Sequence, residues 1–190
     1  EIKKFTRQLM TTTLYFTHHQ EESMTLGDRV AVMCDGRMNQ CAPPLEIYSQ
    51  PADRFVASFL GMPPMNFLEG QLESAGGRVV FTSPAGRLSV ADDAQSLLNG
   101  DSSRSVVAGI RPEAFALHEG GEEGLPAAVQ VVEPLGSTMD VFLQASTGQT
   151  LVCRTAARQL EETAQVRAVA DPQRVYLFEP NAADGKNLLL

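Results

Sequence analysis

From residue 66 to residue 179 the sequence alternates between short apolar stretches and turn residues, and this alternation constrains the fold more than any other feature. Glycine and asparagine in the turns, as at Gly76-Gly77 and Asn99-Gly100, allow the backbone to reverse tightly. Many short strands at this spacing predict a β-barrel or β-sandwich of the OB kind, and their grouping before and after Gly120-Gly121 predicts a barrel in two parts. The predicted strands cover residues 67–73, 78–82, 87–90, 106–111, 127–133, 139–144, 150–154, 165–170 and 174–178.

The first part of the chain mixes helical and strand signals. Runs rich in β-branched and aromatic residues predict strands, and carboxylates followed by spaced apolar residues predict a helix. The last helix of this part is amphipathic, with Phe55, Val56, Phe59 and Leu60 on its apolar side. The expected elements are a buried strand at 11–17, a helix at 20–26, strands at 29–34 and 37–41 around an Asp35-Gly36 turn, a helical turn opened by Pro43-Pro44, and the amphipathic helix at 53–60.

A run of helix-breaking residues, Gly61-Met62-Pro63-Pro64, separates these two textures. It predicts a domain boundary, with residues 1–61 forming one unit and residues 62–190 another. The expected fold class is therefore mainly β, with an OB-like β-domain preceded by a partial α/β segment.

Charge and hydropathy exclude two classes of partner. The formal net charge is -8 and no dense Lys/Arg run is present, so the chain lacks the cationic face that nucleic-acid binding requires. No stretch approaches the roughly 20 apolar residues of a membrane span, and the first residues lack a secretory signal. Contact with a membrane is expected to pass through a protein partner, without direct insertion.

The three cysteines, Cys34, Cys41 and Cys153, predict free thiols. Their odd number and spacing favour neither a disulfide framework nor a zinc site. If Asp35-Gly36 form a two-residue turn, Cys34 pairs with Arg37 and Cys41 faces Val30. The first two cysteines are then not opposed across the hairpin.

Three segments together resemble a known family. Residues 11–33, TTTLYFTHHQEESMTLGDRVAVM, resemble the switch-histidine region of ABC ATPases. Residues 35–70, DGRMNQCAPPLEIYSQPADRFVASFLGMPPMNFLEG, resemble the stretch that follows it in the sugar and glycerol-phosphate importer branch, which includes the maltose-importer ATPase. GIRPE at 109–113 and VVEPLG at 131–136 look like the accessory TOBE β-domain of that branch. The chain thus resembles the C-terminal part of such an ATP-binding subunit over nearly its whole length.

This resemblance implies a role for His18. At the end of a strand its imidazole would donate a hydrogen bond to the γ-phosphate of ATP and help to position the attacking water beside a carboxylate base. His19 stands where the family usually carries Asp. The resemblance also implies partners: a second copy of the ATPase subunit in a homodimer that the β-domain helps to hold, and transmembrane permease subunits. It places the protein in the cytoplasm, on the inner face of the bacterial membrane.

Most of an ATP site is missing from the sequence. The phosphate loop GxxxxGK[ST] is absent, because Gly185-Lys186 is followed by Asn187 and no glycine stands five places before Gly185. No LSGGQ-like signature occurs, and no apolar strand ends in an Asp-Glu pair. We therefore expect ATP and magnesium to be bound in the parent subunit, and this chain alone to hold no cofactor or metal and to be no enzyme.

Other candidate sites have plainer explanations. Asp28 and Arg29 point to opposite faces of an extended segment, which favours a turn role over a charge pair. Glu21 and Glu22 lack a third metal ligand and are expected on a solvated helix face. A structural role is also expected for a pair in the GIRPE motif, Arg111 and Glu113.

Two alternative functions come from other classes of protein. Related OB-like modules bind oxyanions, and Ser137-Thr138 after Gly136 would contribute to such a site, although a turn between two strands explains them equally well. An OB fold for single-stranded nucleic acid needs a basic groove with stacking aromatics, which this acidic chain does not supply.

The strand expected at 11–17 has a further consequence. Its usual neighbours are not present in this chain, and an apolar strand with unpaired edges invites pairing with another copy. We therefore expect residues 1–60 to be disordered, rearranged or paired across a dimer.

Overall fold

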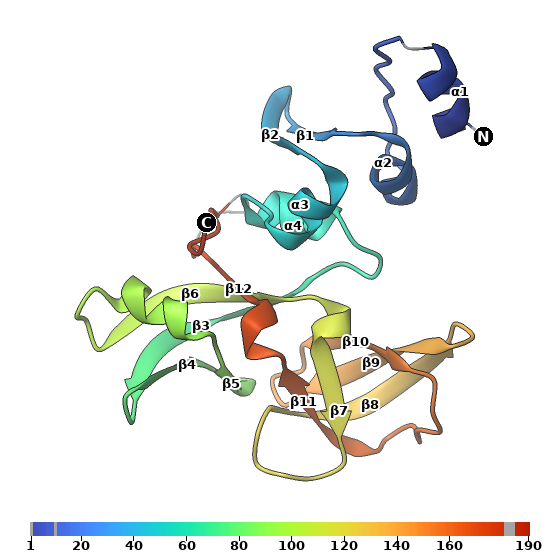
Figure 1. Ribbon diagram of the computed structural model, residues 1–190. Coiled ribbons are helices and arrows are strands. Elements are labelled where there is room, and N and C mark those ends of the chain that lie inside the picture. Colours follow the sequence, from blue (N-terminus) through green and yellow to red (C-terminus); the bar gives the residue numbers. More distant parts are fainter. Residues whose placement is uncertain (1, 10, 181–184) are drawn as a thin grey trace.

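The computed structural model describes residues 2–9, 11–180 and 185–190 (Figure 1). Two five-stranded antiparallel sheets form the larger part, which we call the β-domain (residues 66–178). The helices and the one hairpin of the N-terminal part lie on one side of it, and the first helix lies farthest from the sheets (Figure 1). The expectation of a mainly β fold preceded by a mixed segment is confirmed.

The first sheet has the strand order β12-β6-β3-β4-β5. Its central pair, β3 and β6, stays in register from Asn66 opposite Ile110 to Glu73 opposite Ser103. The 3-10 helix η1 (Asp92–Leu98) connects β5 to β6. The strands are β3 (Asn66–Ala75), β4 (Arg78–Ser83), β5 (Gly86–Ser89), β6 (Ser103–Ile110) and β12 (Val175–Phe178).

The second sheet has the order β10-β9-β8-β11-β7. Short 3-10 turns, η2 (Pro112–Ala114) and η3 (Pro172–Arg174), precede β7 and β12. The two sheets exchange strands, because β12 joins the first sheet and β7 belongs to the second. The strands are β7 (Phe115–His118), β8 (Leu125–Pro134), β9 (Thr138–Ala145), β10 (Thr150–Ala156) and β11 (Gln165–Ala170).

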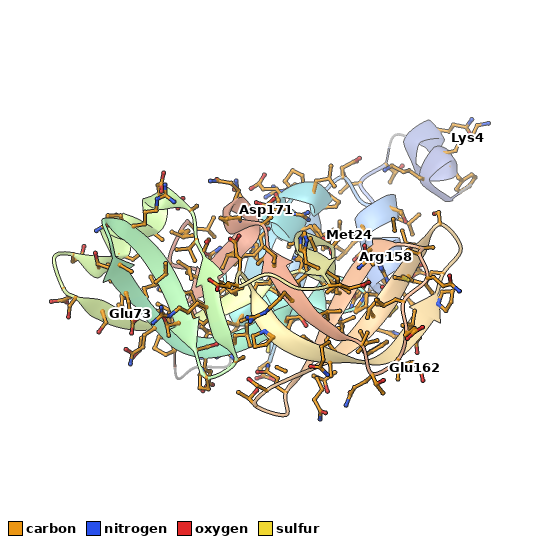
Figure 2. The ribbon with its side chains drawn as sticks, turned by 90° about the horizontal axis from the view of Figure 1, so that it is seen from below. Lys4, Met24, Glu73, Arg158, Glu162 and Asp171 are labelled. Carbon is orange, nitrogen blue, oxygen red and sulfur yellow. The ribbon has the colours of Figure 1, made fainter. Side chains whose placement is uncertain are left out.

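Every strand expected beyond residue 66 is present, and β7 is an additional one. Alternate apolar residues of both sheets meet in one core, where Leu72 and Phe81 of the first sheet belong to the same buried cluster as Leu143 and Leu151 of the second. Figure 2 shows Glu73 and Glu162 near opposite ends of this β-domain, while Lys4 lies apart from both sheets. The period-2 pattern of the sequence thus buries one face of each sheet.

The N-terminal part contains a separate β-hairpin. Asp35 and Gly36 both have positive φ, 47° and 75°, as expected of a two-residue hairpin turn. Cys34 lies opposite Arg37, but Cys41 lies opposite Ala31 rather than Val30, because an irregularity between Val32 and Met33 shifts the register. The elements are α1 (Ile2–Leu9), α2 (Gln20–Leu26), β1 (Val30–Cys34), β2 (Arg37–Ala42), α3 (Pro44–Ser49) and α4 (Arg54–Phe59).

The strand expected at 11–17 is not formed. Among the described residues this segment has no ladder partner, and Leu14 and Phe16 are 79% and 83% exposed. Strand propensity reflects packing against neighbouring strands, so it cannot create a strand where no neighbour is present. The segment 11–17 is therefore a largely exposed connection without regular secondary structure.

Helices α3 and α4 are docked on the β-domain (Figure 1). Asp53 caps α4 by accepting a hydrogen bond from Val56 N at 2.8 Å. Ala57 packs in a small cluster with Met65, Val107 and Phe178. Ala57, not Phe59, therefore completes the buried face of α4, because the docked β-domain meets this side of the helix; Phe59 is 37% exposed.

Backbone hydrogen bonds of the C-terminal residues connect α4 to the β-domain. Arg54 N donates to Gly185 O at 2.9 Å, and Asn187 N donates to Ala52 O at 2.9 Å. Leu188 N donates to Leu177 O of β12 at 2.7 Å. These contacts cross the expected domain boundary at residue 61. The division into residues 1–61 and 62–190 stays a prediction. Residues 1, 10 and 181–184 of the two expected units lie outside the described residues.

Candidate functional site

His18 and His19 lie between the exposed segment and α2, and both are exposed. Their rings are 4.3 Å apart between centroids and tilted by 34°. His19 is the N-cap residue of α2, but its side chain makes no capping hydrogen bond. Its carbonyl accepts a hydrogen bond from Ser23 N at 3.2 Å. Both imidazoles are therefore accessible at the beginning of the helix.

Glu22 accepts hydrogen bonds from two hydroxyl groups of the segment 11–17. Thr17 Oγ1 donates to Glu22 Oε2 at 2.7 Å, and the Tyr15 hydroxyl donates to the same oxygen at 3.0 Å. These hydrogen bonds, that of Thr17 first, lower the pKa of Glu22, and the nearby His19 and His18 act in the same direction. The bond to Glu22 in turn raises the pKa of Tyr15. An ionised carboxylate thus lies one helical turn from the histidine pair.

The remaining candidates for a metal site are acidic, cysteine and histidine side chains. Within the described ranges no three His, Cys, Asp or Glu side chains are grouped so as to hold a metal ion. Arg29 Nη2 donates to Cys41 O at 2.9 Å, so Arg29, just before β1, is hydrogen-bonded to β2. Ser137 precedes β9 and Thr138 is its first residue, at the turn that follows β8.

Arg111 is the largest fully buried side chain, with 1% of its surface exposed. Its guanidinium donates to Leu60 O at 2.6 Å and to Tyr48 O at 2.7 Å. The same group lies over the Tyr48 ring at 3.6 Å from the centroid. Arg111 follows β6 directly, so it joins the β-domain to the ends of α3 and α4. This agrees with the structural role expected from the sequence.

Glu113 extends this junction. It accepts from the Tyr48 hydroxyl at 2.7 Å and from Arg174 Nη2 at 3.2 Å. Burial, followed by the hydrogen bond to Glu113, raises the pKa of Tyr48 to about 12. Tyr48 therefore stays protonated at neutral pH and holds α3 against the 3-10 turn after Arg111.

Gln20 was not singled out by its sequence. Its Oε1 accepts a hydrogen bond from Gly61 N at 2.9 Å across 41 residues of chain. This bond connects the first residue of α2 to the residue that follows α4 and its C-cap. A lone glutamine at a helix start carries no sequence signal for such a contact, because only the fold brings the two segments together.

No helix in the described part of the chain has the length and hydrophobicity needed to cross a membrane.

Two domain families match overlapping parts of the chain. The MalK OB fold domain matches residues 61–115, and the TOBE domain matches residues 108–178. Together these matches span the β-domain from its first strand to its last.

Curated relatives match over most of the chain. The sulfoquinovosyl glycerol transport ATP-binding protein SmoE of Agrobacterium fabrum is 39% identical over 181 residues, which are 94% of this chain and 49% of that protein. The trehalose/maltose import ATP-binding protein MalK of Thermococcus litoralis is 41% identical over 94% of this chain and 50% of its own length. The sn-glycerol-3-phosphate import ATP-binding protein UgpC of Salmonella typhimurium is 42% identical, covering 84% and 43%. The chain spans about half the length of these relatives.

Proposed function

Because this chain belongs to the sugar and glycerol-phosphate importer branch of the ABC transporter ATP-binding subunits, we propose that it works as part of a subunit that hydrolyses ATP to drive the uptake of a sugar or a related solute. One observation carries this proposal. The two domain families match only residues 61–178, whereas the relatives match over as much as 94% of the chain. The similarity therefore extends well into the segment that precedes the β-domain.

In this proposal His18 is the switch histidine of the subunit. It is exposed two residues before the first residue of α2, so its imidazole is open to solvent. A neutral or charged imidazole donates one hydrogen bond to a γ-phosphate, which holds the phosphate in line with the attacking water. Glu22 is engaged with Thr17 and Tyr15, so the base that activates the water comes from another part of the subunit.

The ATP phosphates are held elsewhere in such a subunit. The Gly185-Lys186 sequence of this chain lies in the C-terminal segment that contacts α4, where the backbone of Lys186 forms an isolated antiparallel β-bridge with Asp53 and its carbonyl accepts a hydrogen bond from Glu179 N. A phosphate loop instead directs successive backbone N–H groups at the ligand. Residues 185–187 therefore do not fit a phosphate cradle.

The two regions of the chain take different roles in the proposed subunit. The exposed apolar residues Leu14 and Phe16 pack against the remaining part of the ATP-binding subunit, which completes the sheet that 11–17 cannot form alone. The β-domain helps to hold two copies together and receives regulatory signals. The subunit attaches to the cytoplasmic side of the membrane through permease subunits.

The test uses a chimaeric subunit in which this chain replaces the matching half of the Thermococcus litoralis relative. His18→Ala is expected to lower the rate of ATP hydrolysis about 100-fold or more, since general acid–base and positioning groups contribute about 10²–10⁴. ATP affinity, measured by calorimetry, stays within a few-fold. His19→Ala is the matched control and is expected to retain most of the activity. Full hydrolysis by His18→Ala would contradict the proposed role.

A second titration separates the proposal from oxyanion binding. The unmodified chain is titrated with molybdate and, in parallel, with magnesium ATP. The proposal expects no saturable heat from either ligand. Saturable molybdate binding would favour a free-standing oxyanion-binding module, and tight ATP binding would reveal a nucleotide site within this chain.

A further inference from the structure

The peptide group between Leu60 and Gly61 is hydrogen-bonded on both sides. Its carbonyl oxygen accepts from Arg111 Nη1 at 2.6 Å, and its N–H donates to Gln20 Oε1 at 2.9 Å. One peptide group thus lies between the β-domain, through Arg111, and the first residue of α2. Gln20 is two positions after His18.

Gly61 permits this close arrangement. Its φ is +126°, a conformation that L side chains rarely adopt. A Cβ atom at this position would lie 2.9 Å from Arg111 Nη1 and 3.5 Å from Cε2 of Tyr48. A side chain here would push the guanidinium away from the Leu60 carbonyl. The glycine therefore serves the junction and is not simply a break between two domains.

The two hydrogen bonds strengthen each other. A charged donor on a carbonyl polarises the peptide group, which makes its N–H a better donor. Arg111 is buried, so water does not screen its bond to Leu60 O. Gln20 accepts from the N–H of the same peptide group, and its bond is weakened when Arg111 is lost.

Arg111 is itself held in one place. Its second hydrogen bond, to Tyr48 O at 2.7 Å, and the Tyr48 ring beneath it fix the plane of the guanidinium. Tyr48 is in turn bonded to Glu113, two residues after Arg111. The β-domain end of the connection is therefore rigid, and a displacement of β6 would move the Leu60–Gly61 peptide with it.

The geometry points to Gln20 as a positioning residue that ties the start of α2, and with it His18, to the β-domain through the Leu60–Gly61 peptide and Arg111. Its importance for ATP hydrolysis rests on the role proposed for His18; the mechanical connection does not. A signal received by the β-domain reaches residues 15–26, which we call the histidine segment, along this path. It does not pass through the hairpin β1–β2.

The connection is tested by amide hydrogen exchange in the chain without nucleotide, followed by NMR. Gln20→Met removes the acceptor at nearly the same length, and exchange of the Gly61 amide is expected to rise about 3- to 10-fold for the loss of one hydrogen bond. Gln20→Glu keeps an oxygen acceptor and is expected to restore protection to within about twofold of the wild type. Unchanged Gly61 exchange in Gln20→Met would overturn the inference.

A second pair of variants tests whether the effect travels from the β-domain. Arg111→Met is expected to raise exchange of the Gly61 amide and also of α2, for example at Ser23 N, which donates to His19 O. Arg154→Met is the matched control, because Arg154 Nη1 donates to Met62 O, only two residues further along the chain. It is expected to leave α2 unchanged. Equal effects of the two variants on α2, or none from Arg111→Met, would overturn the inference.

The chimaeric subunit then separates this inference from the proposed function. If both hold, Gln20→Met lowers kcat for ATP hydrolysis several-fold with little change in KM, and Gln20→Glu restores it. If His18→Ala has no effect while the exchange results stand, the proposed function fails and the connection survives. If His18→Ala abolishes hydrolysis but Gln20→Met changes neither exchange nor kcat, the connection fails and the function survives.

Discussion

The β-domain and the segment 11–42 bury their apolar side chains in very different ways. In the β-domain both sheets close over a single core, and Phe81 and Leu143 have no exposed surface. In the segment 11–42, Leu14, Phe16, Met33 and Met38 are all more than half exposed. The hairpin β1–β2 contributes Val32, Ala42 and the partly buried Val30 to a small cluster with α3 and α4. One region completes its own core, and the other leaves several large apolar side chains exposed.

This difference has a lesson for function. A segment with few buried apolar contacts opens locally at a lower free-energy cost than a closed core does. The histidine segment has few buried contacts. Its Gln20 side chain accepts a hydrogen bond from Gly61 N, next to the residues that Arg111 contacts. Through the Leu60–Gly61 peptide the β-domain is therefore hydrogen-bonded to a region with few buried contacts of its own.

The largest expected effect separates two phenylalanines. Phe81→Ala is expected to lower the free energy of unfolding by about 3–5 kcal/mol, because it empties part of a closed core. Phe16→Ala, at a side chain that is 83% exposed, is expected to change it by no more than about 0.5 kcal/mol. Urea denaturation measures both. Similar losses in the two variants would show that 11–17 is packed in solution.

The next effect depends on pH and concerns Cys153 in the β-domain core. Burial raises its pKa from 9.0 to about 12, so between these values the folded chain keeps a proton that the unfolded chain has released. The free energy of unfolding must therefore fall as the pH rises from 9, by as much as about 1.4 kcal/mol per pH unit. Tyr48 acts in the same direction between 10.0 and about 12.

Cys153→Ala provides the comparison for this effect. The variant removes the thiol, so its stability should decline less steeply above pH 9 than that of the wild type. Denaturation curves recorded at intervals up to pH 11 measure the two slopes. Equal slopes would mean that the thiol of Cys153 is already ionised in the folded chain.

A smaller effect compares two arginine–carboxylate pairs. Arg154 contacts Asp140 through two nitrogens, each at 2.7 Å, and Asp140 is 5% exposed. Arg154→Met leaves that carboxylate without these partners and is expected to cost about 1–3 kcal/mol. Arg174→Met breaks a more exposed pair at 3.2 Å and is expected to cost about 0.2–1 kcal/mol. The order of the two losses in thermal denaturation checks this, and a reversed order would contradict it.

The smallest effect belongs to the histidine segment. Glu22→Gln weakens the hydrogen bonds from Thr17 and Tyr15 at the surface, so the midpoint of urea denaturation should not change measurably. The local order changes more, because these bonds connect 15–17 to α2. Backbone NMR shifts confined to residues 15–22 are expected, and shifts that spread into the β-domain would be inconsistent with this local role.

The strands of the β-domain could be predicted well because each has a local sequence pattern. Alternating apolar residues and glycine turns placed every expected strand there, and the Asp35-Gly36 turn is equally local. The short strand β7 was not predicted, because four residues between a 3-10 turn and a loop show little hydrophobic periodicity. Helix α1 was likewise not anticipated.

The remaining features depend on which segments the fold brings together. The strand expected at 11–17 needed a neighbour, and the true partner of Cys41 needed a register shift that propensity does not encode. Arg111 was expected to be structural, but its full burial depends on carbonyl groups from two distant helices. The Gln20–Gly61 contact depends in the same way on tertiary structure.

The most direct test of the account compares hydrogen exchange of the 190-residue chain alone with that of the same residues in the chimaeric subunit. The account predicts that amides of 11–17 and of β1–β2 become strongly protected on assembly, while those of β3, β6, β8 and β9 are equally protected in both forms. If 11–42 exchanges equally fast in the two forms, the rest of the subunit does not complete this region. The division of the chain into a self-contained β-domain and a segment awaiting its partner would then be wrong.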